Sequence, residues 1–228
     1  MDIPLEIIGE GKKEDIVISF DNYCVAMIRT KTGRVSNLTL KQLKGENMSC
    51  VIIRSGRCII DSCEISCAED YGIHICGHSE PEISQCNIHH CSFGGILINE
   101  GSAPTIKKNQ IYNTKYSNIT VSEASNPIIK ENEIYNSLQG GIYIKKNSTS
   151  TILCNKIHNN AYSGIAVRDG SRPIIKENII TKNGHFGIEI FNGGAGKIGD
   201  NKVFDNRVDD INIAPDSLNL VEFEGKMK

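Results

Sequence analysis

The stretch Asn155-Lys156-Ile157-His158-Asn159-Asn160-Ala161-Tyr162-Ser163-Gly164-Ile165-Ala166-Val167 recurs along the chain with an unbroken spacing of 23 residues. Its leading asparagine belongs to a column that reads Asn109, Asn132, Asn155, Asn178 and Asn201, with Cys63 and Cys86 at the same phase. Self-similarity at a fixed spacing is the signature of a repeat protein in which each period is one structural unit. The spacing therefore sets the architecture of the chain.

Apolar residues, most of them isoleucine, fill four further columns of the same period. They lie three residues before the asparagine and two, ten and twelve residues after it; the second column reads Ile65, Ile88, Ile111, Ile134, Ile157, Ile180 and Val203. β-branched side chains favour strands, and residues two apart in a strand face the same side. The runs are too short for helices and are interrupted by Gly, Pro, Asn and Ser.

These columns predict an all-β fold: a single-stranded right-handed parallel β-helix, a solenoid with 23-residue coils. One coil comprises three short strands and three turns, and successive coils stack as parallel strands about 4.8 Å apart. The asparagine column is then expected to be a structural ladder, in which each amide bonds to the asparagine of the next coil. A row of ligand-binding amides is the weaker interpretation, because inward amides in a solenoid normally bond to one another.

The chain divides into three segments by its fit to this period. Residues 1–24 are predicted to form an N-terminal cap, residues 25–214 the β-helix coils, and residues 215–228 a C-terminal cap or tail. Such caps cover strand edges that a solenoid would otherwise leave unpaired. One turn before residue 50 is two residues longer, and the phase is expected to resume at Cys50 and Ile52.

A column of glycines precedes the first isoleucine of each Gly-Ile-x-Ile segment. Its members are Gly72, Gly95, Gly141, Gly164 and Gly187. We expect positive φ at these positions, where the chain enters a strand from a tight turn.

Charge and hydropathy bear on the kind of partner and on location. The net charge of −2 gives no reason to expect a nucleic acid or an anionic membrane as partner. No apolar run reaches the roughly 18 residues of a membrane-spanning helix, and Met1-Asp2-Ile3-Pro4-Leu5-Glu6 has neither the basic nor the apolar region of a signal peptide. The sequence therefore predicts a cytoplasmic protein.

Nine cysteines raise the question of disulfides and metal binding. Their odd number and the lack of any CxxC pair argue against a disulfide framework. Two clusters carry the types of residue that bind zinc: His74, Cys76 and His78, and Cys67, His89, His90 and Cys91. Neither spacing supplies four tetrahedral ligands by itself. We therefore predict no metal and no cofactor.

The outward positions of the Gly-Ile-x-Ile strands vary from coil to coil, unlike the repeated lysines and glutamates before the asparagine column. Aromatic and charged residues gather there: Tyr143, Lys145, Arg168, Glu189 and Phe191. Aromatic and arginine side chains on a rigid surface are typical of binding hot spots. These five residues are predicted to form a binding face. Nearby Glu100, Glu123 and Asp169 could take part in acid–base chemistry, but a solvated charged face has the same composition, so no catalytic residue is assigned.

The repeat Pro-x-Ile-x-x-Asn-x-Ile-[Tyr/His]-Asn…Gly-Ile-x-Ile, found at residues 127–144 and 173–190, resembles the β-helix repeats of the pectin-lyase-like superfamily. More narrowly, residues 5–11, 33–40 and 158–164 resemble the β-helix domains, of carbohydrate-binding and sugar-hydrolase type, of F-box-only ubiquitin-ligase subunits. The narrower resemblance implies recognition of substrate proteins, and the wider one implies sugar cleavage. The chain has no room for an F-box, and no lyase-type catalytic set carries over.

From the sequence we predict a non-catalytic β-helix module that binds a protein or peptide. The alternative is a carbohydrate-binding protein or a carbohydrate-active enzyme, either a polysaccharide lyase or a glycoside hydrolase, on the same fold.

Overall fold

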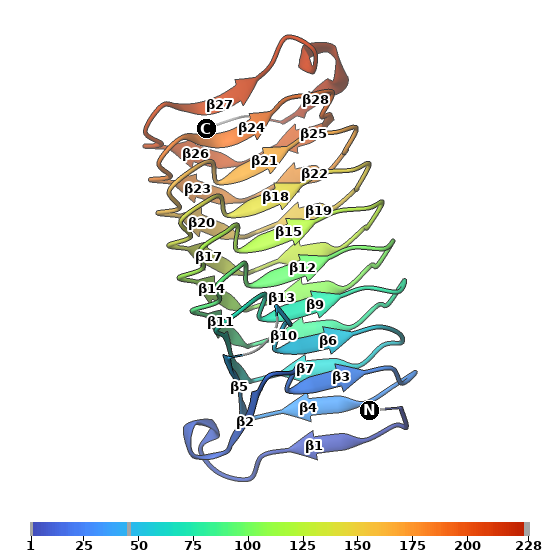
Figure 1. Cartoon of the computed structure of the whole chain (residues 1–228). Coiled ribbons are helices and arrows are strands. Elements are labelled where there is room, and N and C mark those ends of the chain that lie inside the picture. Colours follow the sequence, from blue (N-terminus) through green and yellow to red (C-terminus); the bar gives the residue numbers. More distant parts are fainter. Residues whose placement is uncertain (1, 45–46, 226–228) are drawn as a thin grey trace.

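The computed structural model describes residues 2–44 and 47–225 and shows a right-handed parallel β-helix with three faces (Figure 1). Each face is one parallel sheet to which every coil adds one short strand. This is the predicted fold.

The first two faces, sheets A and B, contain the following strands. Sheet A comprises β1 (Glu6–Ile8), β4 (Arg34–Ser36), β7 (Ile59–Asp61), β10 (Glu82–Ser84), β13 (Thr105–Lys107), β16 (Ile128–Lys130), β19 (Thr151–Leu153), β22 (Ile174–Lys176), β25 (Gly196–Gly199) and β28 (Val221–Glu224). Sheet B comprises β2 (Val17–Asp21), β5 (Thr39–Lys44), β8 (Glu64–Cys67), β11 (Asn87–His89), β14 (Gln110–Tyr112), β17 (Glu133–Tyr135), β20 (Lys156–His158), β23 (Ile179–Thr181) and β26 (Lys202–Phe204).

The third face, sheet C, is the one toward the viewer in Figure 1. It comprises β3 (Ala26–Ile28), β6 (Val51–Ile53), β9 (Ile73–Ile75), β12 (Ile96–Ile98), β15 (Ile119–Val121), β18 (Ile142–Ile144), β21 (Ile165–Val167), β24 (Phe186–Ile190) and β27 (Asp209–Ile213). Two short 3₁₀ helices, Lys13–Asp15 and Leu218–Leu220, lie near the ends of the chain. The described part of the chain contains no helix with the length and hydropathy needed to cross a bilayer.

The isoleucine columns pair in register and fill the interior. On β17 and β20, for example, Ile134 lies opposite Ile157, and both side chains are completely buried. Burying an isoleucine contributes roughly 1.5–3 kcal/mol. The stacked columns are therefore the main source of stability, and they hold each outward side chain at a fixed height on its face.

The asparagine column forms the predicted ladder. Asn132 Nδ2 donates to Asn155 Oδ1 (3.0 Å), and Asn155 Nδ2 donates to Asn178 Oδ1 (3.0 Å). The same bonds join Asn109 to Asn132 (3.0 Å) and Asn178 to Asn201 (2.9 Å). Each of these amides is almost fully buried. Since their donors and acceptors are used on one another and on the backbone, the ladder is structural.

A second amide ladder, which the sequence analysis missed, runs through the turn between sheets B and C. Asn160 Nδ2 donates to Asn183 Oδ1 (3.0 Å), and Asn183 Nδ2 donates to Asn206 Oδ1 (3.0 Å). The 23-residue spacing of these asparagines was the available signal. It is interrupted in the preceding coils, where Ser137 and Thr114 occupy the column.

The prediction of positive φ in the glycine column is wrong. Positive φ falls instead on non-glycine residues of the turn between sheets A and B, such as Glu131 (57°) and Cys154 (54°). The glycines are needed for space: a Cβ on Gly164 would lie 2.6 Å from Ile180 Cγ2 and 2.8 Å from Asn183 Nδ2. Glycine in this column lets the chain pass close over the buried side chains of sheet B.

The phase predicted for the early coils is wrong by one residue. Val51 and Ile53, not Cys50 and Ile52, pair with the inward residues of β9. A one-residue shift exchanges the two faces of a strand. Ile52 therefore lies in the outward column of sheet C, where it is nevertheless only 4% exposed.

The segments predicted as caps both contribute strands to the sheets. Residues 1–24 contain β1 and β2, which pair in parallel with β4 and β5. Residues 215–228 contain β28, which pairs with β25. The sheets therefore extend beyond the predicted limits of the coils at both ends.

Candidate functional site

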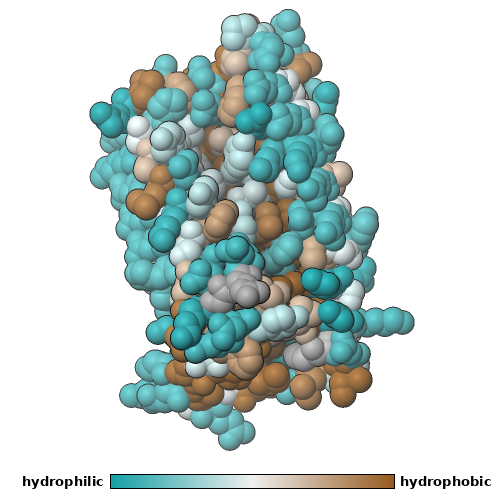
Figure 2. Space-filling view, in the orientation of Figure 1, coloured by the Kyte–Doolittle hydropathy of each residue, from teal (hydrophilic) through white to brown (hydrophobic). Residues whose placement is uncertain are grey.

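The outward face of sheet C carries the side chains that vary most between coils. Its central column reads His74, Leu97, Thr120, Tyr143, Ala166, Glu189 and Asn212. Figure 2 shows this face: weakly polar and apolar residues, white to brown, run along its middle between hydrophilic margins. A ligand on this face would therefore meet apolar and weakly polar groups along part of the middle, as at Leu97, Thr120, Tyr143 and Ala166, and charged groups around them.

The structure brings the predicted binding residues together. Arg168 Nη1 donates to the Tyr143 hydroxyl (3.2 Å), and Arg168 Cζ lies 5.3 Å from the centre of the Phe191 ring. Lys145 Nζ lies 5.2 Å from the centre of the Tyr143 ring. Glu189 lies on β24. It pairs in register with Ala166 on β21, which in turn pairs with Tyr143 on β18. Side chains that are 23 or 25 residues apart in sequence thus become neighbours because coils stack in register.

A notch of about 270 Å³ is lined by three of the five predicted residues, Tyr143, Glu189 and Phe191. Its floor includes Ala166, which lies between Tyr143 on β18 and Glu189 on β24. Further lining comes from residues that the sequence analysis missed: Ser117, Gln139, Gly140, Tyr162 and Ser163. The notch exists because alanine, serine and glycine fall where neighbouring coils carry larger side chains.

The tyrosine in the turn before β21 could have been found from the same period. Tyr162 shares its column with Phe93 and Tyr116, whose rings stack with centres 4.5 Å apart. The Tyr162 side chain is 54% exposed. It supplies an aromatic wall on the side of the notch opposite Phe191.

Arg168, beside the notch, and Glu189, in its lining, both have hydrogen-bonding partners. Hydrogen bonds to Asp169 and to the Tyr143 hydroxyl raise the pKa of Arg168, which remains a cation. The Glu189 carboxylate accepts a hydrogen bond from the Ser163 hydroxyl (2.6 Å), and His185 Nδ1 lies 3.9 Å away. The notch is therefore lined by the Glu189 carboxylate toward β24, and the cations Lys145 and Arg168 lie beside it, next to Tyr143 and Phe191.

The lining is suited to binding more than to acid–base cleavage. Hydrolysis of a glycosidic bond ordinarily uses two carboxyl groups placed on either side of the bond. Among the described residues that line the notch, Glu189 is the only carboxylate. Outside the notch, Glu123 pairs with Lys146 (3.0 Å), and Glu100 accepts the Gly77 N–H (3.0 Å).

The residues considered for zinc do not come together as one set of ligands. Cys67 and Cys91 are buried in the interior, whereas His89 lies on the outer face of sheet B. There His89 Nδ1 is 2.6 Å from His90 Nδ1, and His89 Nε2 contacts Glu64. His74 Nε2 bonds to Asn99 Oδ1 on sheet C (3.0 Å). No group of three or more metal-ligating side chains occurs within residues 2–44 and 47–225.

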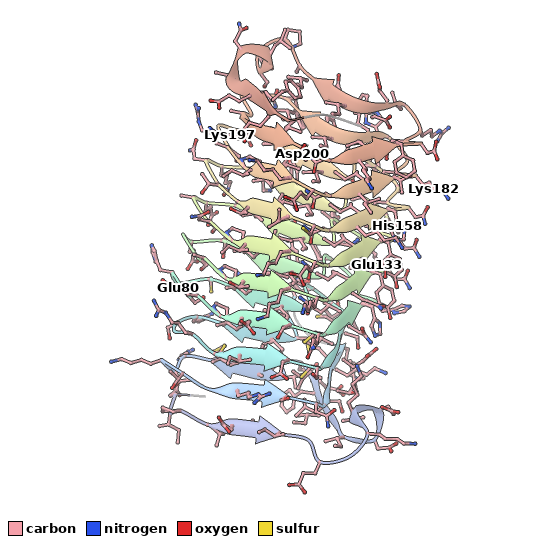
Figure 3. All side chains as sticks on the ribbon, turned by 180° about the vertical axis from the view of Figure 1, so that it is seen from behind. Glu80, Glu133, His158, Lys182, Lys197 and Asp200 are labelled. Atoms are coloured by element: carbon pink, nitrogen blue, oxygen red, sulfur yellow. The ribbon has the colours of Figure 1, made fainter. Side chains whose placement is uncertain are left out.

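A second row of rings lies on sheet B. His89, Tyr112, Tyr135 and His158 stack from coil to coil with centres 4.9–5.2 Å apart. Figure 3 labels His158 and its partner Glu133 at the end of this row. Each ring covers the face of the next, so the row contributes to coil stacking. Only the edges of these rings are then accessible to a ligand.

The family model of the right-handed β-helix region matches residues 24–152 and 130–222. No curated protein sequence matches the chain significantly.

Solved structures with the same fold include alginate and mannuronan epimerases. A single-site variant of the periplasmic alginate epimerase AlgG has a TM-score of 0.68 and 17% identity over 89% of this chain and 61% of that one. The A-module of the mannuronan C-5 epimerase AlgE6 from Azotobacter vinelandii has a TM-score of 0.70 and 14% identity over 90% of this chain and 67% of that one.

At such low identity the likeness concerns the fold alone, and the chain spans only about 61% of the length of the AlgG chain. The narrower resemblance to the F-box-only subunits gains no support from these matches and stays a prediction. The match to the family model extends over most of the sequence. The chain therefore belongs to the family of the right-handed β-helix region.

Proposed function

We propose that this chain is a carbohydrate-binding β-helix protein whose ligand, an acidic glycan, lies in the notch on sheet C. The observation that carries the proposal is that Lys145 and Arg168 lie against the rings of Tyr143 and Phe191. These two rings line the notch together with Tyr162. Aromatic rings provide flat surfaces for the apolar faces of sugar rings. Arginine recognises carboxylates through charge-assisted hydrogen bonds.

The structural neighbours support the same class of ligand. Their names state that they act on alginate and on mannuronan, which are polymers of uronic acids with a carboxylate on each sugar ring. A cationic margin beside aromatic rings fits such a polymer better than a neutral one. The likeness of fold and the cations beside the notch thus favour the carbohydrate alternative over the protein or peptide ligand that the sequence favoured.

The test is a titration of the purified chain with oligomannuronates and, for comparison, with a neutral β-1,4-glucan oligomer. We expect binding of the acidic glycan only, weakening with added salt because exposed charges are screened over about 8–10 Å. The double variant Tyr143→Ala with Arg168→Ala should lose at least tenfold in affinity. That corresponds to about 1.4 kcal/mol or more, as expected for a charge-assisted contact.

The matched control changes an aliphatic and a cationic side chain on sheet A. Ile128→Ala with Lys130→Ala alters outward positions of β16, which lies on sheet A and therefore on a different face of the solenoid from the notch. It should bind like the wild type, and the thermal midpoints of both double variants should stay near that of the wild type. Equal binding by the wild type and the Tyr143/Arg168 variant would refute the site.

Protein or peptide binding and a cytoplasmic location stay predictions from the sequence. The rigid, varied face of sheet C would serve a protein partner through the same aromatic and arginine residues. If no glycan binds, a partner captured by the wild type and lost from the Tyr143/Arg168 variant would favour that interpretation.

A further inference from the structure

The small residues beside the notch form a trough of limited length. They occupy the column two residues before the first inward isoleucine of each sheet C strand. From the N-terminal to the C-terminal side this column reads Tyr71, Gly94, Ser117, Gly140, Ser163 and Phe186. An aromatic residue therefore stands at each end of a run of glycine and serine.

The ring at the N-terminal end covers the trough. A Cβ placed on Gly94 would lie 2.8 Å from Tyr71 Cε1, so the Tyr71 ring lies directly over this glycine. The Tyr71 hydroxyl also lies near the Thr120 side chain, which is two coils further along the face. Tyr71 thus fills the trough up to the coil that contains Ser117.

The ring at the C-terminal end is fixed as well. Phe186 lies next to the His185 ring, with centres 4.1 Å apart. The Glu189 carboxylate on the same strand is tied to the Ser163 hydroxyl. The open floor is therefore confined to the coils of Ser117, Gly140 and Ser163, a distance of about 10 Å at the usual strand spacing.

The sides of this trough are also closed. Gln139 and Tyr162, from the turn before sheet C, line one side, and Phe191 lines the other, where Arg168 lies beside it. Large side chains thus stand at both ends of the run of small residues and on both of its sides, and the interior of a long polymer lying on the floor would have to pass over one of them.

On this basis, and resting on the proposed function, we propose that the notch recognises the end of an acidic glycan chain, with room for about two sugar rings. The carboxylate of the sugar faces Arg168 and Lys145, and its hydroxyls donate to Glu189. The Ala166 side chain sets the depth of the notch, and Tyr71 sets its length.

The experiment is isothermal titration of the chain with oligomannuronates of one to six residues and with polymannuronate of known chain length. We expect the affinity to level off at the disaccharide or trisaccharide. Binding of the polymer should be stoichiometric with its chain ends and not with its total sugar content.

Two variants test the boundaries. Ala166→Tyr fills the notch and should weaken disaccharide binding at least tenfold. Tyr71→Ala opens one end and should increase the affinity for tetramer to hexamer over that for the dimer. The matched control, Thr151→Tyr, adds the same ring to an outward position on sheet A and should bind like the wild type.

The outcomes separate the two proposals. Affinity that rises steadily from dimer to hexamer in the wild type, with binding unchanged in Ala166→Tyr, would overturn the chain-end proposal but leave acidic-glycan binding intact. If neither oligomers nor polymer bind the wild type, both proposals fail. The affinities of the wild type for oligomannuronates of increasing length test the chain-end proposal even if a variant does not fold.

Discussion

Asn155 shows how much one side chain contributes within a solenoid. Its Nδ2 donates to Ile129 O (2.8 Å) and to Asn178 Oδ1 (3.0 Å), and its Oδ1 accepts two bonds from Asn132. Asn155→Ala leaves several buried polar groups unpaired, at a cost of about 1–3 kcal/mol for each. We expect a large fall in the urea midpoint with an unchanged m-value. Asn126→Ala, at an exposed asparagine, is the control and should unfold like the wild type.

Gly164 tests whether the glycine column serves close approach. An alanine Cβ there would meet the backbone oxygen of Gly187 at 2.8 Å as well as Ile180, so relief requires the next coil to shift. Overpacking of this kind costs about 1–3 kcal/mol or more, and we expect Gly164→Ala to reach the upper end.

The comparison for Gly164→Ala is Gly193→Ala. Gly193 has φ of 69°, but an alanine Cβ there would have no atom within 4 Å, so the substitution meets only the left-handed backbone cost of about 1–2 kcal/mol. Chemical denaturation of both variants gives the two costs separately. Should Gly164→Ala be as stable as the wild type, close packing would not be the reason for this column.

At the scale of elements, sheet B carries ion pairs that depend on pH. Lys156 Nζ (2.7 Å) and His158 Nε2 (3.2 Å) both contact Glu133 Oε1, linking β17 to β20. The hydrogen bond from Lys156 is the main cause that lowers the pKa of Glu133; burial opposes it, and His158 adds to the lowering. A carboxyl group whose pKa is lower in the folded state stabilises the fold above its unfolded pKa of about 4.3.

This stabilisation should disappear as the pH falls through the folded pKa of Glu133. The Glu133 side chain is 34% exposed, so solvent screens the effect and we expect a small one. Urea unfolding at pH 7 and pH 3 should show that Glu133→Gln loses less stability on acidification than the wild type does. Glu131→Gln, in the exposed turn before β17, is the control, and a pH dependence identical in wild type and Glu133→Gln would contradict the assignment.

The regular elements were predictable because a fixed spacing places side chains of successive coils side by side. That rule gave the inward columns, the first asparagine ladder and the grouping of Tyr143 with Arg168. The rule failed at Ile52, where an early coil departs from the period. It also failed for the ladder that begins at Asn160, because serine and threonine occupy the same column in the preceding coils. The notch escaped prediction for a different reason: it results from the small size of Ala166, and its wall includes Tyr162 from an adjacent turn.

At the scale of the molecule, the proposed glycan site spans several coils and depends on their rigid stacking. The lining residues come from segments between Ser117 and Phe191, the middle and later coils of the solenoid. In this part the inward isoleucines are completely buried, as Ile142 and Ile165 illustrate. A binding surface composed of several coils is therefore supported by a completely buried interior.

The ends of the solenoid are packed less well, which predicts a gradient of stability along the chain. End coils have a neighbour on one side only, and in repeat proteins stability is approximately a sum of repeat and nearest-neighbour terms. Large apolar side chains are exposed near the N-terminus, among them Val17 (51%) and Phe20 (53%) on β2. Figure 2 shows the corresponding gathering of hydrophobic residues, in brown, at this end of the molecule.

Amide hydrogen exchange measured by mass spectrometry should therefore show slow exchange in the strands from β12 to β22 and faster exchange in β1, β2, β3 and β28. Local opening of the end coils exposes few buried contacts, whereas opening of a central coil disrupts two interfaces. Binding of an acidic glycan should slow exchange further in β18, β21 and β24, which form the notch. Uniform exchange along the chain would mean that the solenoid opens as one cooperative unit, and the end coils would then be as stable as the coils that hold the site.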